Sequence, residues 1–161
     1  MSGLTQARLK ELLHYDPETG LFTWLVSVGR CRKGSLAGSV MSRGYIRIKV
    51  DGVDYLAHRL VFLFMHGEWP AQEVDHKNGE VTDNRYANLR HASSSQNKMN
   101  TRPRGRLGVK GVSVAVGGRY QAQIKISGVT KPLGLYDSVE EAHAAYVRAA
   151  NDNFGVFARV A

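Results

Sequence analysis

Four polar residues in the middle of the sequence could together hydrolyse a phosphodiester bond. Asp75 and His76 are adjacent, Asn88 stands twelve positions after the histidine, and Asn97 stands twenty-one positions after it. Such hydrolysis needs a divalent cation to neutralise developing charge and a base to activate water. Asp75 can offer a carboxylate ligand and Asn97 an amide oxygen, a sparse set that suits Mg²⁺ or Mn²⁺. His76 suits the base, and an amide oxygen of Asn88 could accept its second ring proton.

Short elements must position these side chains. The pattern predicts a strand, a polar loop, a second short strand and a helix, in that order, over residues 73–76, 77–87, 88–90 and from 94 onward. Ser93 and Gln96 form a capping-box pattern that opens the helix, with Asn97 in its first turn. Neighbours on a regular strand point to opposite faces, so Asp75 and His76 share a site only if the strand bends there. On spacing alone, an ordinary surface turn is the alternative for this pair.

The residues before this segment predict a small unit of mixed helix and strand. We expect a helix capped by Thr5, a turn over 16–20, a strand over 21–26, strands over 45–50 and 53–56, and a buried helix over 58–66. Asp51 and Gly52 are a strong two-residue hairpin signal, which makes the two later strands antiparallel. His58 lies on the apolar helix, where a satisfied, partly buried histidine is expected rather than a metal ligand.

The sequence after residue 108 predicts a second unit of three strands and one helix. The strands are expected over 112–116, 119–126 and 129–136, and the helix from Ser138 onward. Polar and apolar residues alternate on the middle strand, so one face of the sheet is basic and polar. The residues of that face are Arg119, Gln121, Gln123 and Lys125. Before this unit, residues 101–107 have the composition of a basic linker.

The charge distribution favours a polyanionic partner. Lysine and arginine outnumber aspartate and glutamate by 22 to 14, which gives a formal net charge of +8. From Asn84 to Tyr136 there is no acidic residue, and a basic run of this length repels itself unless a polyanion neutralises it. We therefore expect nucleic-acid binding, with a solvated basic face or a membrane surface as the alternatives.

Other bulk features narrow the class of protein. At 161 residues the chain can bury one core or two small ones. Cys31 is the only cysteine, which excludes an internal disulfide and a cysteine-rich zinc site. No apolar run approaches the roughly 20 residues that span a bilayer, and the first residues lack a signal-peptide pattern. We expect a soluble, intracellular protein with no membrane partner.

Seven segments of the N-terminal two thirds resemble one known family. They are residues 15–24, 56–61, 69–70, 74–76, 83–85, 88–90 and 95–97. In residues and spacing they resemble the HNH homing endonucleases of bacteriophages. The resemblance implies a ββα-metal (His-Me finger) fold, one divalent ion on Asp75 and Asn97, His76 as general base and Asn88 as the residue that orients it. Many such enzymes have histidine where this sequence has Asn97, and the asparagine favours Mg²⁺ over a zinc-type ion.

The C-terminal residues resemble a second family. The matching segments are 108–112, 119–124, 133–137 and 140–146. They are similar to the ethylene-response-factor (Apetala-type) DNA-binding domain, whose three-stranded sheet enters the major groove. This resemblance and the linker charges together imply a set of DNA-binding residues. The set is Arg102, Arg104, Arg106, Lys110, Arg119, Gln121, Gln123, Lys125 and Lys131.

These observations lead to an α+β hypothesis for the whole chain. We expect an N-terminal leader over 1–70, an HNH core over 71–100, the linker over 101–107 and the DNA-binding domain over 108–161. The predicted function is metal-dependent hydrolysis of double-stranded DNA, as a monomer that nicks one strand at a recognised site unless two chains cooperate. The expected setting is the cytoplasm of a bacterial host, with the protein encoded by a phage. The alternatives are a catalytically inactive, sequence-specific DNA-binding protein and a nucleic-acid-packaging protein.

Overall fold

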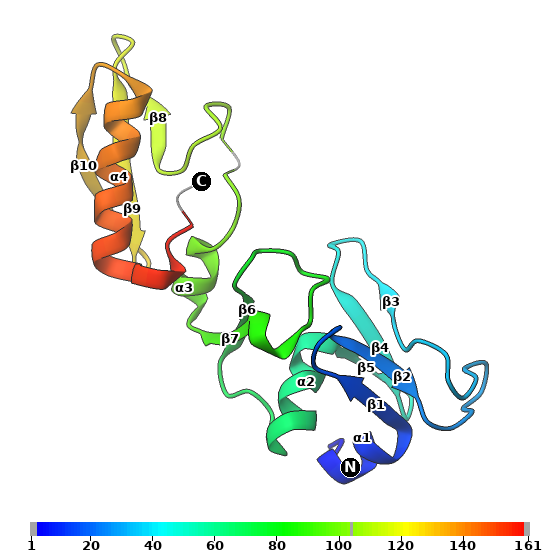
Figure 1. Ribbon diagram of the computed structural model, residues 1–161. Helices are drawn as coiled ribbons and strands as arrows, with labels where there is room; N and C mark the ends of the chain where they lie inside the picture. The colour runs from blue at the N-terminus through cyan, green and yellow to red at the C-terminus, as the bar shows by residue number, and fades with distance from the viewer. Residues whose placement is uncertain (1–2, 104, 160–161) are drawn as a thin grey trace. The chain divides into compact units, whose positions relative to one another are not determined.

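The computed structural model describes residues 3–103 and 105–159 and divides into two compact units after His91 (Figure 1). Both units combine short antiparallel sheets with helices, which confirms a mixed helix and strand architecture. Within the described ranges, no helix is both long enough and apolar enough to cross a membrane.

The N-terminal unit is built from short elements. In chain order they are α1 (Gln6–Leu12), β1 (Leu13–Asp16), β2 (Leu21–Trp24), β3 (Ser39–Val40), β4 (Ile46–Val50), β5 (Val53–Leu56), α2 (Ala57–His66), β6 (Glu73–His76), the 3-10 helix η1 (Tyr86–Asn88) and β7 (Leu89–Ala92). β1 pairs with β2, β4 lies between β3 and β5, and β6 pairs with β7. The candidate site, described below, involves elements from the start of this unit, β1 and β2, and from its end, β6 and β7.

Local sequence signals account for most of these elements. The side chain of Thr5 accepts a hydrogen bond from the backbone of Arg8 and so caps α1, as predicted. Asp51 and Gly52 both adopt positive φ, at 47° and 83°, which is the conformation of a tight turn between antiparallel strands. β4 and β5 pair in that hairpin, with Val50 opposite Val53. The hairpin prediction is therefore confirmed.

β1 was not predicted, because its first residue continues the helical spacing of Leu9 and Leu12. Leu13 instead leaves the helix and pairs with Trp24 of β2. Burial then alternates along β1, with Leu13 and Tyr15 inside and His14 outside. The strand places the Tyr15 side chain in the core, where it meets the ring of Phe22 at 4.8 Å between centroids.

The core of the N-terminal unit lies between α1, α2 and the inner faces of the small sheets. Leu9, Ile48, Leu60 and Val61 are almost completely buried there. α2 is buried over most of its length, as its uniformly apolar sequence predicted, and ends at Gly67, which takes the left-handed conformation. The helix thereby presents its first turn, with His58, toward the interior.

The C-terminal unit is a three-stranded sheet covered on one side by a long helix (Figure 1). Its elements are α3 (Ser94–Met99), β8 (Val112–Val114), β9 (Tyr120–Ile126), β10 (Val129–Tyr136), α4 (Val139–Phe154) and the 3-10 helix η2 (Gly155–Phe157). β9 is central, and Ala122 and Ile124 are buried beneath α4. Ser138 caps α4, so the predicted three strands and one helix are confirmed.

The boundary between the compact units differs from the predicted domain limits. Residues 71–100 were expected to form one core, but α3 groups with the C-terminal unit. Met99 explains this, because its side chain joins the core cluster that contains Ile124 and Tyr146. The backbone carbonyl of Met99 also accepts a hydrogen bond from Lys110 Nζ. The helix that carries Asn97 is therefore fixed by the C-terminal core.

Candidate active site

Asp75 and His76 end β6 and are both buried, with 3% of each residue exposed. Val74 before them is buried as well, so both faces of this strand end are covered. An exposed surface turn is therefore excluded for this pair. Asp75 contacts Arg90 of β7, whereas His76 contacts Asn84 in the following loop.

The Asp75 carboxylate forms an ion pair with the Arg90 guanidinium. Nε and one terminal nitrogen of Arg90 each lie 2.8 Å from Oδ2 of Asp75. The two side chains are 15% and 4% exposed, so water screens this pair little. Arg90 is not among the site residues that the sequence predicts, although residues 88–90 belong to a predicted strand. Its place in the Asn88-Leu89-Arg90 segment, opposite β6, is what brings it to Asp75.

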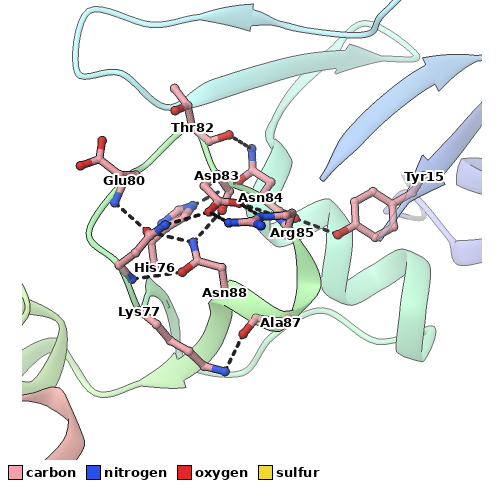
Figure 2. Close-up of polar contacts among 11 residues, drawn as sticks. Tyr15, His76, Lys77, Glu80, Thr82, Asp83, Asn84, Arg85, Ala87 and Asn88 are labelled. Carbon is pink, nitrogen blue, oxygen red and sulfur yellow. Dashed lines mark hydrogen bonds and ion pairs between the residues drawn. The ribbon is translucent and has the colours of Figure 1, made fainter. Parts of the chain in front are cut away.

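The hydrogen bond between His76 and Asn84 sets the tautomer of the histidine. Nε2 of His76 lies 3.2 Å from Oδ1 of Asn84, and the amide nitrogen of Asn84 donates to the Thr82 carbonyl (Figure 2). An amide oxygen only accepts hydrogen bonds, so neutral His76 carries its proton on Nε2 and Nδ1 is the basic nitrogen. Burial lowers the pKa of His76, against the opposing effect of the Asn84 hydrogen bond and the Asp75 charge.

Asn84 is itself held from a distant part of the chain. It is 1% exposed, and its backbone carbonyl accepts a hydrogen bond of 2.8 Å from the Tyr15 hydroxyl (Figure 2). Burial raises the pKa of Tyr15 to about 12, so this hydroxyl keeps its proton at neutral pH. For Asn84 the sequence favours hydrogen bonds that brace the loop, with a second-metal ligand as the alternative. No local signal links it to Tyr15, 69 residues earlier.

Asn88 braces the loop instead of orienting His76, which corrects the expected hydrogen bond between the two. Its Oδ1 accepts from the backbone N–H of Asn78, and its amide nitrogen donates to Asn78 Oδ1 and to the Asp83 carbonyl (Figure 2). These three bonds use both N–H groups of the amide and one lone pair of its oxygen. The physical reason is that the loop between β6 and β7 has backbone groups without strand partners, and Asn88 satisfies two of them.

The same loop is stiffened by a charge cluster around Asp83. Arg85 Nε and one terminal nitrogen contact the two carboxylate oxygens at 2.8 and 2.7 Å, and Asn78 donates to the same carboxylate (Figure 2). The Arg85 guanidinium holds the pKa of Asp83 at about 2. The cluster therefore stays ionised at neutral pH and holds the loop in shape.

His58 packs directly on His76 and differs from the satisfied histidine that the sequence led us to expect. The two rings meet edge to face at 5.2 Å, and Tyr45 lies 5.4 Å from His58. His58 is 6% exposed, and among residues 3–103 and 105–159 its Nδ1 has no hydrogen-bond partner. Burial, with smaller contributions from His76 and Arg59, lowers the pKa of His58 to about 3. His58 is therefore a neutral imidazole throughout the physiological range.

The donor set beside β6 fits a hard cation that keeps most of its water. In residues 3–103 and 105–159, no group of three or more histidine, cysteine, aspartate or glutamate side chains is arranged to hold a metal ion. Zinc sites are built from such groups, whereas Mg²⁺ needs only one or two carboxylates besides water and phosphate. Asp75 is a buried carboxylate of this kind. Asn97 belongs to α3 of the C-terminal unit.

In the C-terminal unit, the middle strand presents the predicted polar face. Gln123 and Lys125 are exposed and alternate with the buried Ala122 and Ile124, and Gln121 lies on the same face. Leu135 pairs with Gln121 in the neighbouring strand and is half exposed. The open face of the sheet therefore mixes amide, ammonium and apolar groups.

The other predicted DNA-binding residues are arranged differently. Arg119 forms an exposed ion pair with Asp137, and Lys131 pairs in register with the buried Ile124, on the α4 side of β10. Lys110 is turned inward, where burial lowers its pKa to about 8. The structure places Arg102 and Arg106 in the segment between α3 and β8, and Arg104 lies outside the described residues.

A family model agrees with the HNH part of the resemblance seen in the sequence. Residues 55–99 match the family model described as HNH endonuclease, a span from the end of β5 to the end of α3. No curated protein matches the chain. Among solved structures the chain is similar to the HNH homing endonuclease I-HmuI, described in work on DNA binding and cleavage. The two are 21% identical, with a TM-score of 0.45 over 88% of this chain and 84% of that one. The segment with HNH endonuclease character is therefore residues 55–99, and it contains Asp75, His76, Asn88 and Asn97.

Proposed function

We propose that the chain is a metal-dependent endonuclease that hydrolyses phosphodiester bonds in double-stranded DNA. The observation that carries this proposal is the buried, neutral His76 with its tautomer set by Asn84, inside the segment that matches the HNH endonuclease model. A base must be neutral to accept a proton, and the lowered pKa of His76 keeps it neutral at physiological pH.

Each residue of the site has a distinct part in this proposal. Nδ1 of His76 takes the proton from the attacking water, and the Nε2 proton stays in the hydrogen bond to Asn84. The Asp75 carboxylate, with Asn97 as the second ligand expected from the sequence, would hold Mg²⁺ or Mn²⁺. Such an ion supplies Lewis-acid stabilisation of the phosphate charge. Asn88 keeps the loop between the strands in shape.

DNA binding is assigned to the C-terminal unit and the basic segment before it. The polar face of β9 offers Gln121 and Gln123, whose amides can pair with the edge of adenine in the major groove, and Lys125 can contact phosphate. In this proposal the unit acts as an Apetala-type domain that docks its sheet on the DNA. The chain works as a monomer that nicks one strand at a recognised site, in the manner of phage homing enzymes in the bacterial cytoplasm.

The ion pair of Asp75 supports one rival function. Because Arg90 already engages the carboxylate at 2.8 Å, the chain could be a DNA-binding protein whose HNH segment has lost its metal and its activity. In the enzyme a cation would bind Asp75 beside the Arg90 guanidinium, which contacts Oδ2, whereas in the rival no cation need bind. Cleavage in the presence of metal therefore separates the two.

The proposal is tested by nicking of supercoiled plasmids that carry a random-sequence library, with Mg²⁺ or Mn²⁺ present. We expect the wild type to produce open circles and His76→Ala to lose at least about 100-fold of that activity, since a positioned base contributes on that order. His14→Ala is the matched control, because His14 is an exposed histidine of β1. Absence of nicking by the wild type in either metal, with DNA binding retained, would favour the inactive binding protein.

A further inference from the structure

The hairpin of β1 and β2 touches the loop that carries Asn84, although the two are far apart in sequence. The Tyr15 hydroxyl donates to the Asn84 backbone carbonyl at 2.8 Å. Tyr15 is 2% exposed, and its ring packs between Phe22 and Phe64, at 4.8 and 5.8 Å. The ring of Tyr15 is therefore held by the core, and its hydroxyl holds the loop at Asn84.

The turn of the same hairpin lies directly on this loop. Gly20 closes the turn with its N–H donating to the Asp16 carbonyl, and its φ is +74°. A Cβ at Gly20 would lie 2.6 Å from the carbonyl carbon of Asn84 and overlap the backbone nitrogen of Arg85. Only glycine permits both this conformation and this close approach. The hairpin thus contacts Asn84 at two places.

The side chain of Asn84 has no freedom to turn its amide. Nδ2 donates to the Thr82 carbonyl at 3.3 Å, and Oδ1 faces Nε2 of His76 at 3.2 Å. A flipped amide would place its oxygen against the Thr82 carbonyl oxygen, which is a repulsive contact. The backbone anchored by Tyr15 and the side chain held by Thr82 therefore present an acceptor to His76.

We propose that Asn84 is a positioning residue for His76, and that Tyr15 and Gly20 of the N-terminal hairpin anchor it. The β1–β2 hairpin is in this view part of the catalytic scaffold, although residues 13–24 lie outside the segment that matches the HNH endonuclease model. The chain of contacts runs from the Tyr15 hydroxyl through Asn84 to Nε2 of His76. This inference rests on the proposed function for the role of His76 as base.

The first experiment measures the tautomer of His76 without any cleavage. The full chain is labelled with ¹⁵N-histidine, and the ring nitrogen shifts are recorded at pH 7.5, where His76 is neutral. We expect a single Nε2–H form in the wild type, a mixture of both tautomers in Asn84→Ala, and a return to Nε2–H in Asn84→Asp, which restores an acceptor. Asn84→Ala with an unchanged Nε2–H form would overturn the inference, whether or not the protein cleaves DNA.

The second experiment separates the anchor from general stability. Tyr15→Phe is compared with Tyr86→Phe, which also loses one hydroxyl hydrogen bond, here to His66 at 2.9 Å. We expect Asn84→Ala to lower kcat by about 10- to 100-fold with little change in KM. Tyr15→Phe should lower kcat by about fivefold, the equivalent of one net hydrogen bond, and Tyr86→Phe should leave it unchanged. Equal effects of the two tyrosine variants would refute the anchor. If the wild type never nicks, the proposed function fails, while the tautomer result still decides the role of Asn84.

Discussion

At the scale of single residues, the site handles its two buried ionisable side chains in different ways. The Asp75 carboxylate pairs with the Arg90 guanidinium of the neighbouring strand at 2.8 Å. His76 is neutral, because burial disfavours the imidazolium more than the Asn84 hydrogen bond and the Asp75 charge favour it, and its pKa is lowered. An anionic ligand and a neutral base are what a metal-assisted hydrolysis needs side by side.

The Asp75–Arg90 pair gives a prediction about stability and metal binding. Arg90→Met removes the guanidinium that pairs with a buried carboxylate, so the free energy of unfolding should fall by about 3 kcal/mol. Arg47→Met is the matched control, since the Arg47–Asp54 pair is nearly half exposed and should contribute less than about 1 kcal/mol. The measurement is urea unfolding of each variant without added metal.

The same variant then tests whether a cation and Arg90 compete for Asp75. If they do, saturating Mn²⁺ should stabilise Arg90→Met more than it stabilises the wild type, because the ion binds only the folded state. Equal stabilisation of both proteins, or of neither, would contradict competition at this carboxylate.

His58 predicts how stability depends on pH. Its pKa is about 3 in the folded protein and 6.5 as a free side chain, so between these values the unfolded state binds a proton that the folded state does not. Stability should therefore fall as the pH is lowered through this window, by up to about 1.4 kcal/mol per pH unit from this group. His58→Phe keeps a ring against His76 and should flatten the slope. Urea unfolding between pH 7 and pH 4 measures it, and His14→Phe, on an exposed position, should retain the wild-type slope.

At this scale, the role of a residue could be predicted only where its evidence lies in neighbouring positions of the sequence. Asp75 and His76 stand out because an acid and a histidine end one short strand, and both proved to be buried. Asn84 could not be recognised in the same way, because its contact with Tyr15 spans 69 residues and depends on the packing of the whole N-terminal core. Asn88 has the expected residue type, but its amide is used by its own loop.

At the scale of elements, signals confined to a few residues were reliable guides. The Asp51-Gly52 turn, the Ser93 capping box and the alternation along β9 each dictate backbone geometry locally, and each is present as predicted. β1 was not predicted, because Leu13 fits the spacing of a helix as well as that of a strand. Its pairing with β2 makes it part of a strand. The missed element is the one that carries Tyr15. A strand that forms only by pairing with another strand is hard to predict from sequence. β1 is such a strand, and its Tyr15 contacts the loop of the candidate site.

At the scale of the whole molecule, the division after His91 separates the base from one expected metal ligand. Asp75 and His76 belong to the N-terminal unit, while Asn97 lies on a helix whose Met99 packs into the C-terminal core. Asn97 therefore stays a ligand that is predicted from its spacing to His76. The sequence could not show that α3 belongs to a different compact unit from β6 and β7, because α3 follows β7 directly along the chain.

The charge of the whole chain gives the last prediction, on how DNA binding depends on salt. The linker arginines are proposed to contact phosphates, and each such contact releases counterions when DNA binds. The double variant Arg104→Gln and Arg106→Gln should therefore weaken binding to all sequences alike and reduce the slope of log Kd against log salt concentration by about one per lost contact. Arg8→Gln with Arg47→Gln removes the same charge from arginines already paired with acidic residues. If net charge alone governs binding, both double variants shift the slope equally; if the linker lies on the phosphates, only the first one does.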